Sequence, residues 1–152
     1  EAPSGFVPDA EDCAIVARLI GREPRIGFRV ALRRECSGVP MVIENLPFSP
    51  DGSPNPNWFW LVDPALRRRI DRLEASGGVK RAELLIDPLL IERSHRLYAS
   101  GRRNLSSACG VADPGGGVGG TRQGVKCLHA HVAYHLVGGY APVGAWALRQ
   151  LR

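Results

Sequence analysis

The sequence lacks an apolar run of the roughly 18 residues that a membrane-spanning helix needs. Residues 1–10 contain neither the basic region nor the apolar core of a secretory signal, so we expect a cytoplasmic protein without a membrane partner. No two of the four cysteines form a CxxC pair, which favours free thiols over a disulfide scaffold. The cysteines are Cys13, Cys36, Cys109 and Cys127.

Lysine is scarce, because only Lys80 and Lys126 accompany 18 arginines among the 20 basic residues. Against 15 acidic residues the net charge is +5. The basic residues are scattered along the chain rather than gathered into one stripe, which disfavours nucleic acid as a partner without excluding it. An adaptor that docks an acidic protein or a nucleic acid therefore stays open as an alternative, and the oligomeric state is not predicted.

Several motifs of catalysis are also missing. The segment GGGVGGTR at residues 115–122 is followed by no Gly-Lys-Ser/Thr and follows no strand, so it is neither a Walker A loop nor a dinucleotide fingerprint. No GxSxG or HExxH occurs. Asp63 and Asp87 are explained as helix caps, which leaves no obvious acid/base pair of carboxylates.

A length of 152 residues, with 44% apolar and 23% charged residues, predicts one globular domain over residues 1–152. Apolar/charged alternation, turn signals and Asp-Pro helix starts predict α+β architecture, a three-stranded antiparallel sheet covered by four to five helices. The expected strands are 28–33, 41–45 and 58–62. The expected helices are 10–20, 63–74, 79–86, 87–103, 121–137 and 143–151, the third and last of them short.

The segment from Cys109 to Leu136 is the most informative part of the chain. Six glycines between Gly110 and Gly120 precede the helix expected from Thr121. On that helix Arg122, Lys126 and His129 would share a narrow arc. Free amides and a helix N-terminus suit a phosphate group. We therefore predict a phosphate site assembled from these three side chains and from the amides of residues 116–121, which include Gly119, Gly120 and Thr121.

Other side chains are candidates for the same site, and for some of them a second interpretation stays open. Arg33 and Arg34 are candidates to assist with phosphates, and Trp60 or Trp58 to stack on a base, although both indoles also suit a hydrophobic core. His129 lies close to apolar residues on the helical wheel, so it is either a ligand contact or a hydrogen-bonded core histidine.

A divalent metal, Zn²⁺ or Mg²⁺, is the alternative cofactor, although the sequence requires none. Cys127, His131 and His135 would lie at i, i+4 and i+8 on one helical face, which could hold Zn²⁺ in a metal-dependent hydrolase. A fourth ligand would come from elsewhere in the chain. The competing interpretation is a polar helix face with one buried thiol. The candidates for the fourth ligand are Cys36, Glu44 and His95.

Several strings resemble the bacterial domain-of-unknown-function family numbered 501. They are REC-SGVP at residues 34–40, DGSP at 51–54, the Trp60-Leu61 strand and above all VKCLHA at 125–130. The resemblance covers most of the chain, and it implies a small, cytoplasmic, single-domain protein. It marks Cys36, Lys126, Cys127 and His129 without assigning them a role.

The resemblance implies a gene of the kind that often lies beside phosphatases of the exopolyphosphatase type, and with it a guanosine polyphosphate alarmone or polyphosphate as ligand. Together with the predicted phosphate site, this gives our first functional hypothesis. The protein binds a phosphate-rich small ligand, and whether it also hydrolyses that ligand stays open.

Overall fold

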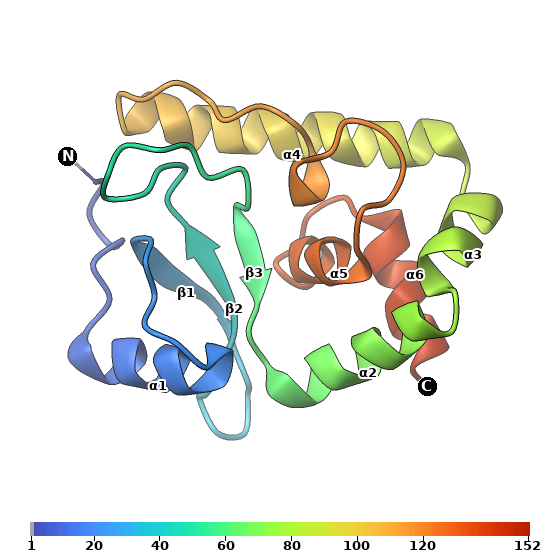
Figure 1. Cartoon of the computed structure of the whole chain (residues 1–152), viewed down its shortest axis with the longest axis horizontal. Coiled ribbons are helices and arrows are strands. Elements are labelled where there is room, and N and C mark those ends of the chain that lie inside the picture. Colours follow the sequence, from blue (N-terminus) through green and yellow to red (C-terminus); the bar gives the residue numbers. More distant parts are fainter. Residues whose placement is uncertain (1) are drawn as a thin grey trace.

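Three short strands form an antiparallel sheet, as the sequence predicts. The order of the strands in the sheet is β1-β2-β3 (Figure 1). The computed structural model describes residues 2–152. Ile43 at the centre of the sheet pairs with Val30 on one side and Trp60 on the other. The strands are β1 (Phe28–Arg33), β2 (Pro40–Asn45) and β3 (Phe59–Leu61).

Six α-helices and one 3₁₀ turn surround the sheet within the described residues, slightly more helices than the four to five predicted. Three of them begin at an aspartate whose side chain accepts a backbone N–H of the first turn, which stabilises the helix start. These are α1 (Ala10–Ile20), α2 (Pro64–Ala75) and α4 (Pro88–Ala108). The others are α3 (Gly78–Leu85), η1 (Val118–Gly120), α5 (Leu128–Leu136) and α6 (Pro142–Gln150).

The two faces of the sheet are covered by different helices (Figure 1). Ile43 packs with Val16 of α1 on one face. Val42, the next residue along β2, packs with Leu61 and with α5 and α6 on the other face. Adjacent strand residues point to opposite faces, so β2 is buried on both sides. Within the described residues, no helix combines the length and apolarity that crossing a bilayer requires.

Helix α5 begins at Leu128, so the predicted start at Thr121 is wrong. Gly124, inside the predicted helix, adopts a positive φ of 63°, which a right-handed helix does not permit. The amides of Val125 and Leu128 donate instead to carboxylates of α3 and α2. Arg122 and Lys126 consequently lie in a loop, and the helical arc predicted for them does not exist.

Candidate functional site

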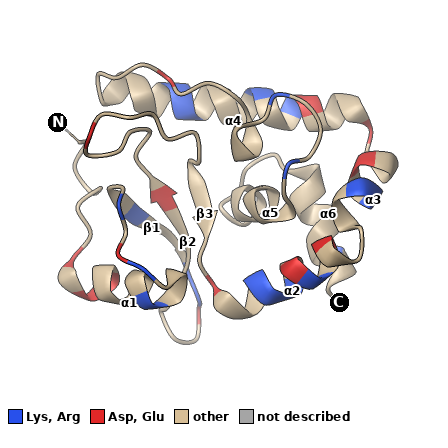
Figure 2. Ribbon diagram, in the orientation of Figure 1, with Lys and Arg blue, Asp and Glu red and all other residues tan. Residues whose placement is uncertain are grey.

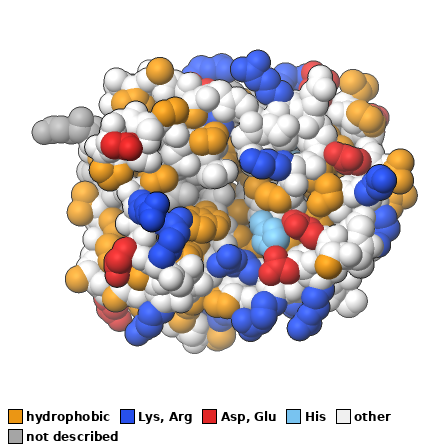
Figure 3. Space-filling view, in the orientation of Figure 1, with side chains coloured by type: hydrophobic (Ala, Val, Ile, Leu, Met, Phe, Trp, Pro, Cys, Tyr) orange, Lys and Arg blue, Asp and Glu red, His pale blue; other side chains and the backbone are white. Residues whose placement is uncertain are grey.

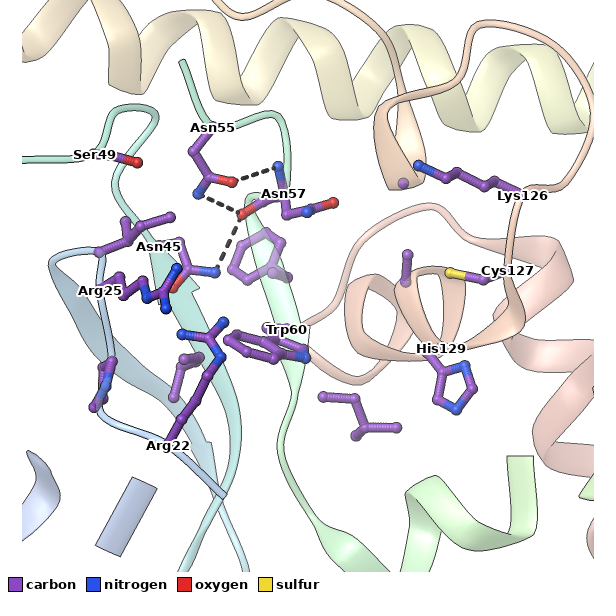
Figure 4. Close-up of a pocket in the computed structure, with 17 residues that line it drawn as sticks. Arg22, Arg25, Asn45, Ser49, Asn55, Asn57, Trp60, Lys126, Cys127 and His129 are labelled. Atoms are coloured by element: carbon purple, nitrogen blue, oxygen red, sulfur yellow. Dashed lines mark hydrogen bonds between the residues drawn. The ribbon is translucent and has the colours of Figure 1, made fainter. Parts of the chain in front are cut away.

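A cleft of about 460 Å³ lies between the sheet and the N-terminus of α5 (Figure 4). One wall comes from the turn that joins α1 to β1. The floor is formed by β2 and β3, and the other wall by η1 and the residues that precede and begin α5. In the space-filling view, the same face of the molecule is hollowed near its centre, with Lys and Arg side chains at the border (Figure 3).

Three strong cations face this cleft from opposite walls. Arg22 and Arg25 come from the α1–β1 connection, and Lys126 comes from the segment before α5 (Figure 4). None of them forms an ion pair within residues 2–152. The 17 lining residues include no aspartate or glutamate. The cleft therefore presents uncompensated positive charge, which favours an anionic ligand.

The Lys126 side chain lies against Gly119, whose φ of 68° is in the left-handed region. A Cβ built on Gly119 would lie 3.6 Å from the Cβ and 3.8 Å from the Cδ of Lys126. The lysine stem thus runs along side-chain-free backbone of η1 before its ammonium group reaches the cleft. Gly119 is the one glycine of the predicted phosphate loop that lines this cleft.

Aromatic side chains form part of the floor. Trp60 lies in the cleft with the Arg22 guanidinium 5.4 Å from its ring centroid, and Phe59 lines the cleft beside it. Trp58 belongs elsewhere, because its ring packs at 5.4 Å from Tyr98 in an edge-to-face contact. Of the two candidate stacking residues, only Trp60 lines the cleft.

Asparagines line the sheet end of the cleft. The Asn45 and Asn55 amides both donate to the Asn57 carbonyl, each at 3.2 Å, and Asn55 also donates to Leu46 at 3.0 Å. These bonds order the proline-rich connection between β2 and β3. The Asn57 side chain lies in the cleft itself, where an amide offers both a donor and an acceptor (Figure 4).

His129 lines the cleft as a charged group that is already neutralised. Its Nδ1 lies 2.9 Å from a Glu74 oxygen and its Nε2 lies 2.8 Å from an Asp71 oxygen. The Cys127 side chain contributes most, and together with both carboxylates it raises the pKa of His129 to about 9 against the opposing effect of burial. His129 is thus a hydrogen-bonded histidine that also borders the cleft, and its contact with a ligand stays a prediction.

Cys127 is the N-cap residue of α5 and also lines the cleft. Its side chain does not cap the helix. The Leu128 amide is satisfied by Glu74 of α2 at 2.8 Å, so this N-terminus is partly occupied by the protein itself. A ligand in the cleft would therefore depend mainly on side chains and less on free helix amides.

Five of the predicted ligand residues do not lie in the cleft. Arg33 pairs with Asp12, and Arg34 pairs with Asp63. Arg122 lines a separate hollow beside α4. The last two are Gly120, which lies beside Pro56, and Thr121, whose hydroxyl donates to Gln123.

Three of the six amides of the predicted phosphate nest, residues 116–121, already have partners inside the protein. The Gly117 amide donates to Thr121, the Gly120 amide to Gly117, and the Val118 amide to His95. Interior bonds of this kind order the glycine-rich segment without any ligand. The prediction that these amides together cradle an anion is therefore wrong for these three positions.

The predicted metal ligands are not brought together either. His131 is fully buried, and neither of its ring nitrogens has a hydrogen-bond partner within the described residues. Both ring nitrogens of His95 are engaged, by the Val118 amide and the Gly124 carbonyl. Across residues 2–152, no three His, Cys, Asp or Glu side chains are grouped so that they could hold a metal ion. That result covers Cys127 and His135, and also the fourth-ligand candidates Cys36 and Glu44.

Sequence reasoning missed Arg22, Arg25 and the asparagines of the cleft. The Gly-Arg-Glu-Pro-Arg string at residues 21–25 lies in the connection after the first helix. Residues in such connections carry function more often than their helical neighbours. That string and the Asn-Pro-Asn string at residues 55–57 were the available signals. Neither indicates which distant segment it faces.

Comparison with known proteins assigns the chain to a family without adding an activity. The family model described as Protein of unknown function (DUF501) matches residues 31–149, which is most of the chain. No curated protein and no solved structure matches it. The match includes the cleft residues of β2, β3 and the VKCLHA segment, and it excludes Arg22 and Arg25. The chain therefore belongs to the DUF501 family.

Proposed function

We propose that the protein binds a phosphate-bearing nucleotide in the cationic cleft. The observation that carries the proposal is the convergence of Arg22, Arg25 and Lys126 on one cavity whose lining has no carboxylate. None of the three forms an ion pair within residues 2–152, so an anion of several charges in the cavity would be attracted from both walls. Guanidinium groups also match the oxygens of a phosphate in a bidentate geometry.

The other walls suit the remaining parts of a nucleotide. Trp60 and Phe59 offer aromatic surface, on which any base can stack. Asn57 offers an amide that can donate to and accept from the edge of a base. The volume of about 460 Å³ falls within the range of roughly 300–1,000 Å³ that is usual for small-molecule sites.

Guanosine tetraphosphate and inorganic polyphosphate are the ligands we propose to test first. Each carries several negative charges, but only the nucleotide also uses the aromatic floor. Preference for the nucleotide over polyphosphate of equal charge would support the assignment of Trp60 to the base. A cytoplasmic location, where phosphorylated nucleotides are abundant, is part of the proposal, and hydrolysis of the ligand is left to an activity assay.

Calorimetric titration with guanosine tetraphosphate tests the proposal. We expect Lys126→Ala and Arg25→Ala each to weaken binding by about tenfold, the usual effect of losing one charge-assisted bond. Arg18→Ala is the matched control, because Arg18 is exposed on α1, outside the cleft. Equal affinity in all four proteins, or no heat with any multiply charged nucleotide, would contradict the proposal.

A further inference from the structure

A second hollow, of about 400 Å³, lies beside α4. Three arginines line it, Arg96 and Arg103 from α4 and Arg122 from the loop between η1 and α5. Figure 2 shows basic segments on both of these elements. The backbone of residues 115–117, which are all glycine, forms another part of the lining.

Each of the two carboxylates of this hollow already has an arginine partner. Glu92 pairs with Arg96 at 3.1 Å. Asp113 accepts two bonds from the buried Arg102, at 3.0 and 3.2 Å. Arg103 and Arg122 form no ion pair within residues 2–152. Two positive charges therefore remain uncompensated in the hollow.

The glycine backbone of the hollow is held in place from the interior. His95 accepts the Val118 amide at Nδ1 over 3.0 Å and donates from Nε2 to the Gly124 carbonyl over 2.7 Å. Gly115 lies beside Arg122, since a Cβ built on it would be 3.7 Å from a guanidinium nitrogen. An ordered loop thus presents Arg122 at the rim, next to backbone that has no side chains to block an approaching ligand.

The hollow and the cleft are neighbours. Gly117 lines the hollow, whereas Gly119, two residues later, lines the cleft. Two residues of chain span at most about 7 Å. The two linings therefore approach each other at the η1 turn, which starts at Val118, over a distance that a ligand bearing several phosphates can span.

We infer that the hollow beside α4 is a second phosphate-binding subsite, formed by Arg103 and Arg122. It would hold the outer phosphates of a nucleotide whose base and inner phosphates lie in the cleft, and in this it rests on the proposed function. No Phe, Tyr or Trp lines the hollow. Bare phosphates fit such a surface better than a nucleic-acid strand, which gains from aromatic stacking at successive bases.

Titrations of the full chain with guanosine monophosphate and guanosine tetraphosphate test the subsite. We expect Arg103→Ala and Arg122→Ala each to weaken tetraphosphate binding by about tenfold while changing monophosphate binding less than twofold. Lys126→Ala, in the cleft, should weaken both ligands. Arg18→Ala removes the same charge from a remote surface and should change neither, which separates a local contact from a general effect of net charge.

The outcomes distinguish the two proposals. Tetraphosphate affinity that is unchanged by Arg103→Ala and Arg122→Ala, but reduced by Lys126→Ala, overturns the subsite and leaves the cleft standing. Equal losses for both nucleotides in the arginine variants also overturn it, because the hollow would then not read the additional phosphates. If the wild-type protein binds neither nucleotide, the subsite and the proposed function are overturned together.

Discussion

One carboxylate oxygen of Glu74 contacts both a backbone amide and a side chain at the start of α5. That oxygen accepts the Leu128 amide at 2.8 Å and lies 2.9 Å from Nδ1 of His129. The contact joins α2 to the first turn of α5, directly after Lys126 and Cys127. An acidic side chain at a helix N-terminus also interacts favourably with the helix dipole.

We expect Glu74→Ala to lower the free energy of unfolding by about 2 kcal/mol, because it leaves a helix N–H and a histidinium without this partner. Asp71→Ala is the matched control. The Asp71 carboxylate contacts the same histidine but is 65% exposed, and exposed ion pairs contribute little. Urea unfolding at pH 7 measures both variants, and an equal effect of the two would contradict this account of Glu74.

Individual residues of the cleft differ in how far the sequence predicts them. Lys126, Gly119 and Trp60 were predicted as ligand residues, and they do line the cleft. Arg33 and Arg34 were predicted on charge alone and are instead paired with aspartates. Local chemistry shows that a side chain can hold an anion, but whether it is free to do so depends on partners that are distant in the sequence.

At the scale of elements, the glycine-rich connection before α5 is organised by one buried cation. Arg102 of α4 is fully buried, and its guanidinium donates to the Asp113 carboxylate and to the Gly116 and Pro56 carbonyls. It thereby connects the loop to the segment between β2 and β3. The contact therefore joins two segments that line the cleft, one at Gly119 and the other at Asn57.

We expect Arg102→Met to destabilise the protein by about 3–5 kcal/mol, because an unpaired carboxylate and two carbonyls would remain near the interior. Arg103→Ala, one residue along, should stay within about 0.5 kcal/mol of wild type because the side chain is exposed. Thermal and urea unfolding compare the two. A small effect of Arg102→Met would mean that the loop is ordered by something other than this guanidinium.

The elements themselves are largely predictable. The sheet and the helix that begins after Asp9 follow from local alternation, caps and terminating glycines. The start of α5 does not, because the helical arc predicted for Arg122, Lys126 and His129 takes no account of the tertiary bonds that divert the backbone before Leu128. The carboxylates that divert it lie in α2 and α3, which sequence periodicity cannot relate to α5.

At the scale of the whole molecule, two histidines of α5 make stability depend on pH in opposite directions. Contact with Cys127, Glu74 and Asp71 raises the pKa of His129 to about 9. Burial, and to a lesser extent the neighbouring His95, lowers the pKa of His131 to about 3. The two residues are two positions apart along the helix, but one faces acidic groups and the other faces the core.

The unfolded chain titrates both histidines near pH 6.5. A raised folded-state pKa means that the contribution of His129 is complete below pH 6.5 and is lost as the pH rises toward 9. A lowered folded-state pKa means that the unfolded chain binds the His131 proton first, so stability falls as the pH drops from 6.5 toward 3. We therefore expect the free energy of unfolding to be greatest near pH 6.5, with an acid slope of up to about 1.4 kcal/mol per pH unit.

The variant His131→Leu isolates the acid arm. His131 makes no hydrogen bond, so an apolar side chain of similar size should change stability at pH 7 by less than about 1 kcal/mol. Urea unfolding between pH 4 and pH 8 should show a flatter acid arm and an unchanged alkaline arm. An acid slope equal to that of wild type would assign the loss of stability to carboxylates instead.

The sequence by itself determined the class of fold, the approximate positions of the three strands and the identity of the family, because caps, alternation and the VKCLHA string are local properties. Only the tertiary structure decided which cations face a common cavity. Ion pairing removes Arg33 and Arg34, interior hydrogen bonds occupy the Gly117 and Gly120 amides, and packing brings Arg22 and Arg25 opposite Lys126. Charge and hydrogen bonding act through space, and the spacing of residues along a chain does not record the distances that govern them.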